Sequence, residues 1–234
     1  MRERRKRLRR RLREWARRRT PRQQADRARL WRAGALRPLR RFRRAQPASA
    51  LEPDWSDLWF LYRLVRERRP ETLLEFGSGC STVVLATAVR DNGVGHLWSL
   101  EVDERWARVT QAALPEELRD VVTLVQSRAE ASDRDLPGWT HANVPDVDPD
   151  FLYLDSPPLT SERRVAFDPI DLEPRFRPGF VMVLDGRRRN AFYLRDNLRG
   201  RYNVVEMPLF ADAGRFLFEL EAAPPESSPP GPAL

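Results

Sequence analysis

The middle of the chain alternates short apolar runs with helical segments, and this alternation most restricts the possible folds. The runs that we predict as strands are residues 72–76, 96–101, 121–126, 151–155 and 180–185. Segments with helical spacing and capping or helix-ending residues lie around them, at residues 54–68, 81–90, 103–114 and 189–198. Strands that alternate with helices are typical of a doubly wound, mostly parallel α/β sheet.

The last two predicted strands break this alternation. Residues 202–207 and 215–220 are joined by a short loop that contains no helix. A connection this short suits an antiparallel hairpin at one end of the sheet, because a parallel pair needs a long crossover. The sequence therefore predicts a seven-stranded sheet that finishes in an antiparallel hairpin.

Charge divides the chain into unequal parts. Residues 1–44 hold 20 arginines and Lys6 against three acids, although the whole chain has a net charge of only +8. We therefore predict an Arg-rich arm over residues 1–47, flexible or helical, and an acidic α/β domain over residues 48–221. The Pro- and Ser-rich residues 222–234 are expected to be disordered.

Composition excludes several classes of protein. Hydrophobic residues make up 41% of the chain, which is enough for a packed core. No run reaches the roughly 18 apolar residues of a membrane span, and no apolar segment of a signal peptide follows the basic start. Cys80 is the only cysteine, so an internal disulfide is excluded and a reducing, cytoplasmic location is expected.

The strongest motif is the turn after the first predicted strand. Glu75 ends the strand, and Gly77-Ser78-Gly79 leads into a helix whose free amides can receive a ligand. Position 82, where a dinucleotide fingerprint has its third glycine, is a threonine. Glu101 ends the next strand, where a carboxylate can accept both hydroxyls of a ribose.

These motifs, taken in order, resemble those of the class I S-adenosylmethionine-dependent methyltransferases. Glu75-Phe76-Gly77-Ser78-Gly79 resembles their first motif, and Ser99 to Asp103 their ribose-binding strand end. Residues 121–130, 151–158 and 178–185 resemble their third, fourth and fifth strands. The resemblance implies S-adenosylmethionine as cofactor. The cofactor-binding residues that it implies are Glu75, Gly77, Ser78, Gly79, Ser81, Glu101, Glu130 and Asp155.

Two acids end the fourth and fifth predicted strands, and we expect both in the crevice at the carboxyl edge of the sheet. Asp155 and Asp185 are our candidates for catalysis, since methylation of a hydroxyl needs a proton acceptor. In metal-dependent O-methyltransferases, acids at these positions help to hold a divalent cation. Asp155 and Asp185 are therefore also candidate metal ligands, although Gly186 stands where those enzymes have asparagine. A substrate-positioning or structural role of the pair is the alternative.

Other candidates lie outside these motifs. His141 falls in a predicted long loop, residues 131–150, and is a candidate general base. Cys80 is interpreted as a small packing residue.

The sequence thus predicts an S-adenosylmethionine-dependent methyltransferase that acts on a hydroxyl of a small molecule or glycan. A non-catalytic binding module of this fold and a nicotinamide-dependent oxidoreductase are the alternatives. The basic residues 1–47 are expected to contact a membrane surface or another polyanion, if they do more than remain solvated.

Overall fold

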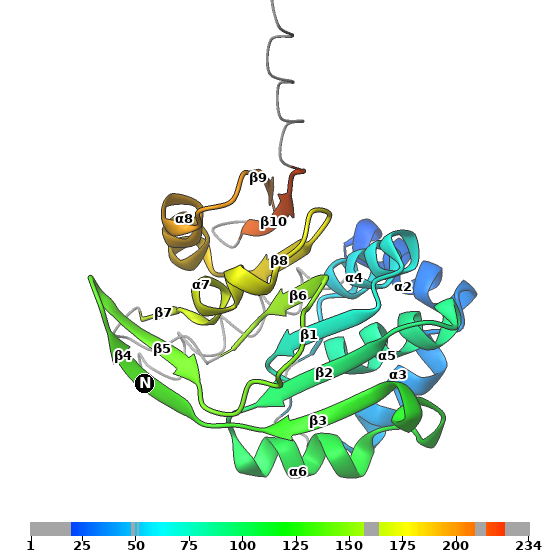
Figure 1. The fold of residues 1–234 in the computed structure, drawn as a ribbon. Helices are drawn as coiled ribbons and strands as arrows, with labels where there is room; N and C mark the ends of the chain where they lie inside the picture. Colours follow the sequence, from blue (N-terminus) through cyan, green and yellow to red (C-terminus); the bar gives the residue numbers. More distant parts are fainter. Residues whose placement is uncertain (1–19, 48–49, 51, 157–163, 209–213, 223–234) are drawn as a thin grey trace, which may run out of the picture.

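A seven-stranded sheet forms the centre of the computed structural model, which describes residues 20–47, 50, 52–156, 164–208 and 214–222 (Figure 1). The strand order is β3-β2-β1-β6-β8-β10-β9, and β10 runs antiparallel to both of its neighbours. This confirms the predicted doubly wound sheet with a terminal hairpin. The strands are β1 (Thr72–Phe76), β2 (His96–Glu101), β3 (Val122–Gln126), β6 (Phe151–Leu154), β8 (Val181–Asp185), β9 (Tyr202–Pro208) and β10 (Gly214–Leu220).

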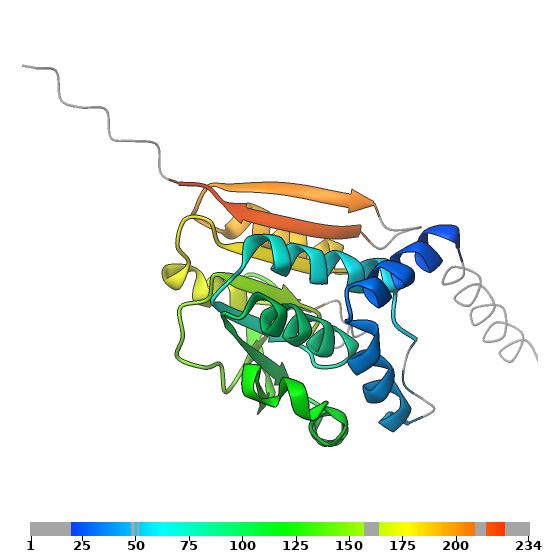
Figure 2. The same cartoon turned by 90° about the vertical axis from the view of Figure 1, so that its right-hand side faces the viewer.

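Helices cover both faces of this sheet (Figures 1 and 2). One face carries α4 (Trp55–Arg68), α5 (Cys80–Asn92) and α6 (Glu104–Ala113), and the other carries α7 (Asp168–Leu172) and α8 (Arg188–Asn197). Short 3₁₀ turns occupy Glu116–Val121 and Glu173–Arg175. Local chemistry sets the starts of the predicted helices. The carboxylate of Asp54 accepts the Ser56 amide at 2.9 Å before α4, and Asp103 accepts the Trp106 amide at 2.8 Å before α6.

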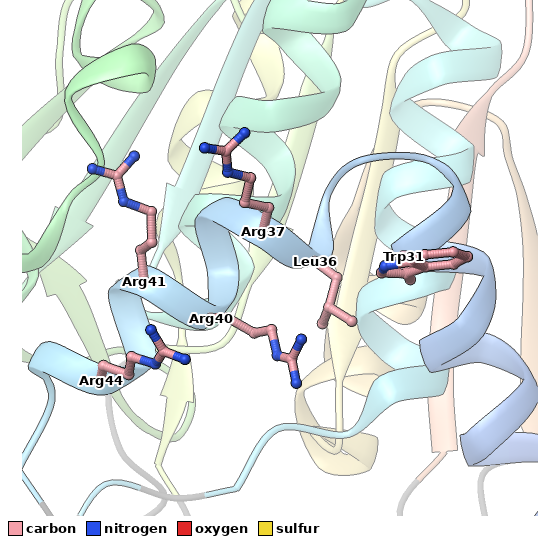
Figure 3. A pocket seen from close by; sticks show the side chains of 6 residues that line it. All are labelled: Trp31, Leu36, Arg37, Arg40, Arg41 and Arg44. Atoms are coloured by element: carbon pink, nitrogen blue, oxygen red, sulfur yellow. The ribbon is translucent and has the colours of Figure 1, made fainter.

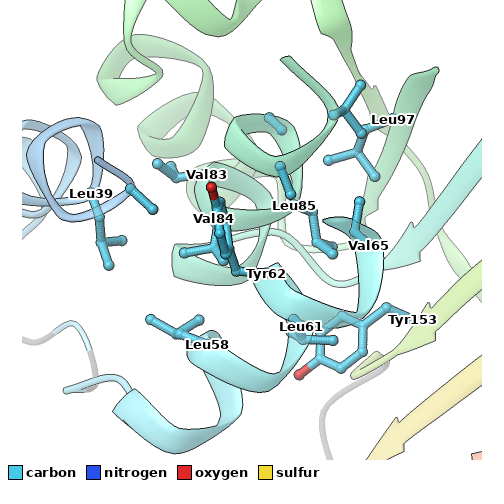
Figure 4. Packing of buried hydrophobic residues seen from close by; sticks show 14 of the residues in the cluster. Leu39, Leu58, Leu61, Tyr62, Val65, Val83, Val84, Leu85, Leu97 and Tyr153 are labelled. Carbon is cyan, nitrogen blue, oxygen red and sulfur yellow. The ribbon is translucent and has the colours of Figure 1, made fainter. Parts of the chain in front are cut away.

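Alternation along the strands sends side chains to two separate cores. On β6, Phe151 and Tyr153 face α4 and α5, whereas Leu152 and Leu154 face the side of α7 and α8. Figure 4 shows Tyr153 beside Leu61 of α4 in the first of these cores. The carboxyl ends of β6 and β8 are in register, because Leu154 pairs with Leu184. The residues that follow, Asp155 and Asp185, therefore lie on neighbouring strands at one edge of the sheet.

The described part of the expected arm is folded. Residues 20–45 form α2 (Pro21–Arg32) and α3 (Leu36–Ala45), and α2 begins with Thr20 as its cap. Leu30, Leu39 and Phe42 are fully buried in the same core as α4 and α5. The prediction placed an arm, flexible or helical, outside the domain up to residue 47. The described part is helical, but its apolar side chains between the arginines pack into the core of the domain. Residues 1–19 lie outside the described residues.

Residues 131–150 differ from the predicted loop. β4 (Ala129–Asp133) and β5 (Pro137–His141) form an antiparallel hairpin, and β7 (Val165–Ala166) extends it. The predicted tail lies outside the described residues apart from Ala222. No described helix has the length and apolar character that a membrane crossing requires.

Candidate functional site

The turn between β1 and α5 packs directly against the end of β6. Gly77 has φ +102°, and a Cβ at this position would lie 3.1 Å from the carbonyl oxygen of Asp155 and from Cβ of Ser156. Only glycine combines this backbone conformation with so close an approach. A Cβ on Gly79 would meet nothing within 4 Å. The space beside Gly79, at the amino end of α5, is therefore open to a ligand.

Glu75 lies beneath this turn and is fully buried. Its Oε2 accepts hydrogen bonds from the hydroxyls of Thr82 and Ser99, both at 2.6 Å. Burial raises the pKa of Glu75 to about 7, against the effect of the Ser81, Ser99 and Thr82 hydroxyls. Its Oε1 is also buried and has no hydrogen-bond partner among the described residues. Through Thr82, Glu75 therefore holds the start of α5 from beneath the turn.

Glu101 connects the end of β2 to the same turn. Its Oε2 accepts the amide of Ser78 at 3.0 Å and the Ser78 hydroxyl at 2.8 Å, and its Oε1 accepts the Asp103 amide at 3.0 Å. The indole of Trp106 donates to the Ser78 carbonyl at 3.0 Å from the other side. The structure thus brings the predicted residues Glu75, Ser78 and Glu101 together. Trp106 of α6 is a further residue in contact with the turn, and the sequence analysis did not select it.

The two acids at the ends of β6 and β8 share a cation. Arg187 is buried and its guanidinium lies 3.6 Å from the carboxylate of Asp155, whose side chain is 52% exposed. Partial desolvation of Asp155 raises its pKa, whereas the charge of Arg187 lowers it. The pKa of Asp185 is also raised, first by burial and then by the charge of Asp155, and the Tyr153 hydroxyl opposes this shift. The pKa of Asp185 reaches about 7, so this carboxyl group is poised to hold a proton near neutral pH.

The site does not fit a divalent cation. Asn190 follows Asp185 closely enough to be considered as a third ligand, but it is 4% exposed. Its Oδ1 accepts the Ala166 amide at 2.8 Å and its Nδ2 donates to the Ala166 carbonyl. The side chain of Asn190 therefore binds the backbone of β7 rather than a metal. The guanidinium of Arg187 already supplies positive charge beside Asp155. No group of three His, Cys, Asp or Glu side chains suited to a metal occurs among the described residues.

His141 lies at the end of β5, in a chain of three hydrogen-bonded side chains. Its Nδ1 is 2.9 Å from Oδ2 of Asp168, and its Nε2 is 3.2 Å from the hydroxyl of Ser156. Asp168 also accepts the His141 amide at 2.7 Å. All three residues are buried, and the imidazole packs 4.7 Å from the Phe76 ring, measured between centroids. His141 is therefore connected to the end of β6 through Ser156, the residue after Asp155.

Helices α2 and α4 contribute polar groups near Asp185. Arg215 is directly opposite Asp185 across the β8–β10 pair, forms an ion pair with Asp57 of α4 and lies over the Phe60 ring. Asp54 raises the pKa of Asp185 through its charge. Gln23 of α2 donates to Asp54 at 2.6 Å and accepts the Trp55 amide at 2.7 Å. Through Gln23 and Asp54, α2 and the start of α4 are thus connected to the carboxyl end of β8.

Two other candidates lie apart from these contacts. The side chain of Glu130 is exposed on β4, 3.7 Å from Arg128, and has no hydrogen bond to Glu101 or the turn. Ser127 lies closer to Glu101, because its amide donates to the Glu101 carbonyl at 2.8 Å. Cys80 packs against the core, and burial raises the pKa of its thiol to about 11, in agreement with a packing role.

Comparison with solved structures finds the same fold in known methyltransferases. The Podospora anserina methyltransferase PaMTH1, bound to S-adenosylhomocysteine, is 14% identical with a TM-score of 0.56, covering 80% of this chain and 88% of that one. A Bacillus cereus O-methyltransferase in complex with S-adenosylhomocysteine is 18% identical with a TM-score of 0.54, covering 80% and 90%. The Streptomyces achromogenes O-methyltransferase TomG, in complex with S-adenosylmethionine, is 16% identical with a TM-score of 0.53, covering 80% and 89%.

The fold is thus the class I methyltransferase α/β fold. Residues 74–186, from β1 through the end of β8, match a family model described as a methyltransferase domain. Residues 74–186 are thus similar to a methyltransferase domain, within a chain whose fold is that of the class I S-adenosylmethionine-dependent methyltransferases. None of the curated proteins compared with the chain matches it.

Proposed function

We propose that this methyltransferase binds S-adenosylmethionine at the turn after β1 and methylates a hydroxyl group of a small-molecule or glycan acceptor. The observation that carries the proposal is the position of Asp155. Its carboxylate is half exposed, its pKa is raised, and its backbone lies against Gly77 of the turn. An acid at this place can receive the proton that a hydroxyl loses on methylation.

The turn offers groups for polar parts of the cofactor. We assign the ribose hydroxyls to Glu101 and the methionyl carboxylate to the open amino end of α5 at Gly79. Glu75 is fully buried, so we assign it to the support of the turn beneath the cofactor. Gly77, Ser78 and Ser81 shape the same turn. We leave Glu130 out, because its exposed side chain has no contact with the turn. The bound cofactor supplies a methyl group on a positively charged sulfur, which is already an activated leaving group.

The residues of the chain then have to orient the acceptor and take up its proton. The bound cofactor would supply the methyl group and keep the electron pair of the carbon–sulfur bond, while the residues at the strand ends would orient the acceptor oxygen. The hydroxyl proton passes to the carboxylate of Asp155, and Arg187 stabilises that carboxylate before transfer. Asp185 is a second acid at this edge, and the charge of Asp155 raises its pKa.

We assign His141 a positioning role rather than direct catalysis. Its side chain has no exposed surface, so it does not reach an acceptor. It holds the Ser156 hydroxyl, and thereby the backbone next to Asp155. The similar structures from Bacillus cereus and Streptomyces achromogenes are O-methyltransferases, and this supports oxygen as the methylated atom.

An acceptor screen tests the proposal. The purified full chain is incubated with S-adenosylmethionine and a panel of hydroxyl-bearing small molecules and glycans, and release of S-adenosylhomocysteine is measured. We expect an acceptor-dependent release that Asp155→Asn lowers by about 10²-fold or more. Asp171→Asn, on the exposed surface of α7, serves as the control and should keep wild-type turnover. Full turnover by Asp155→Asn would remove Asp155 from catalysis.

The Arg-rich amino-terminal region also enters the proposal, as a contact for an anionic surface.

A further inference from the structure

The junction between α2 and α3 forms a recess with an unusual lining. Its volume is about 360 Å³. Four arginines of α3 and two apolar residues form its walls (Figure 3): Trp31, Leu36, Arg37, Arg40, Arg41 and Arg44. We call these six residues the basic recess.

The arginines of the basic recess carry charge that the fold leaves largely uncompensated. Arg41 pairs with Glu117 at 3.2 Å. Arg37, Arg40 and Arg44 are exposed, and no ion pair to a described residue is found for them. In Figure 3, Arg40 extends into the space between Arg44 and Leu36. The region thus concentrates positive charge with little internal neutralisation.

Trp31 adds an apolar group at one end of the same surface. Its side chain is 67% exposed, more than any other large hydrophobic residue in the described segments. The opposite face of α3 is already packed, since Leu39 and Phe42 are fully buried in the core. Trp31 and the arginines therefore face outward, on helices that already bury their apolar side chains in the core. An exposed aromatic residue within a basic surface is typical of an interaction site.

We propose that the basic recess docks the protein on an anionic phospholipid surface. Guanidinium groups bind lipid phosphates, and an indole ring beside them suits the boundary between headgroups and acyl chains. The adjoining residues 1–19 hold 11 arginines and Lys6 against two acids, so the chain continues the same charge directly before α2.

A lipid surface explains the recess better than a nucleic acid does. Proteins that hold single-stranded nucleic acids offer several aromatic side chains on which successive bases stack. Among the described residues that line the recess, Trp31 is the only aromatic one, and its apolar neighbour is the aliphatic Leu36. A single ring next to an aliphatic side chain and arginines matches an interfacial anchor instead.

Vesicle sedimentation tests this assignment with the full chain. Binding is compared on vesicles of phosphatidylcholine alone and of phosphatidylcholine mixed with phosphatidylglycerol, at low and at high salt. We expect binding to the anionic vesicles only, and weaker binding at high salt. The triple variant Arg37→Ser, Arg40→Ser, Arg44→Ser should bind anionic vesicles at least about tenfold more weakly. Trp31→Ala should lose the part of the binding that persists at high salt.

A matched variant separates the recess from net charge. Arg105, Arg108 and Arg119 are exposed on and after α6, and their triple serine variant removes the same charge elsewhere. This control should bind anionic vesicles to within about twofold of the wild type. Equal loss in both triple variants would overturn the proposal, as would wild-type binding by the recess variant or binding of poly(U) without binding to anionic vesicles. Binding of S-adenosylhomocysteine, measured in parallel, reports on the cofactor site separately.

Discussion

The guanidinium of Arg187 and the carboxylate of Asp155 lie 3.6 Å apart across the ends of β8 and β6, one side chain buried and the other half exposed. Register produces this relationship, because Leu154 pairs with Leu184 and both chains turn away from the sheet after the next residue. Arg187 stabilises the charged form of Asp155 while burial opposes it. We therefore expect Arg187→Gln to raise the pKa of Asp155 further. Carboxyl NMR of the wild type and the variant measures this shift, and a lowered pKa would contradict the role of Arg187.

Glu75 makes the stability of the protein depend on pH. Its pKa is raised from 4.5 to about 7 in the folded state, so the folded protein holds this proton more tightly than the unfolded chain does. The stabilisation is complete below pH 4.5 and is lost as the pH rises through 7. Glu75→Gln keeps an oxygen for Thr82 and Ser99 but does not titrate.

From about pH 5 to about pH 8, we expect the free energy of unfolding to fall by about 2 to 3 kcal/mol more in the wild type than in Glu75→Gln. Urea denaturation at both pH values measures the difference. Glu104→Gln, on the exposed side of α6, is the control and should follow the wild type. Parallel curves for wild type and Glu75→Gln would show that Glu75 does not titrate in this range.

The buried chain from Asp168 through His141 to Ser156 should contribute to stability. Asp168 accepts two hydrogen bonds from His141, one from its amide and one at Nδ1. In Asp168→Asn, only one oxygen remains to accept them, and an amide group opposes the other donor. We expect a loss of about 1 to 3 kcal/mol in the free energy of unfolding, measured by urea denaturation. Asp171→Asn, which breaks an exposed ion pair with Arg134, should cost less than about 1 kcal/mol. Equal costs would contradict the buried network.

Folding of the domain should require the amino-terminal helices α2 and α3, which begin after Thr20. Phe42 is fully buried, and Phe42→Ala should lower the free energy of unfolding by about 3 to 5 kcal/mol. Removal of residues 1–19 should leave the thermal transition in place, whereas removal of residues 1–47 exposes the α4 surface and should lower it strongly. Thermal denaturation of the three variants checks this. A neutral Phe42→Ala would indicate a separate arm, as the charge distribution alone suggested.

The sheet and the glycine turn were predictable because they depend on local patterns. Strand and helix positions follow from periodicity and from capping residues such as Asp54 and Asp103. Gly77 and Glu101 were identifiable because a strand end, a turn and a helix start are consecutive in the sequence. The register that sets Asp155 beside Asp185 follows from the parallel fold as a whole.

The features that the sequence did not predict depend on contacts between distant segments. Asp168 meets His141 from 27 positions away, and no local pattern links them. The hairpin of β4 and β5 was predicted as a loop, because its residues include Gly138, Pro137 and several polar side chains. In α2 and α3, the buried Leu30, Leu39 and Phe42 are interspersed with arginines, so the segment has the composition of a solvated arm.

The most direct test of the account is calorimetric titration of the full chain and Glu101→Ala with S-adenosylhomocysteine, with NAD as the parallel ligand. We predict saturable binding of S-adenosylhomocysteine and none of NAD. Glu101→Ala should weaken the binding by about tenfold or more, because the variant loses the carboxylate for the ribose hydroxyls. Glu104→Ala, on the exposed surface of the next helix, should bind as the wild type does. Absence of S-adenosylhomocysteine binding, or equal affinity in Glu101→Ala, would contradict the proposed cofactor site.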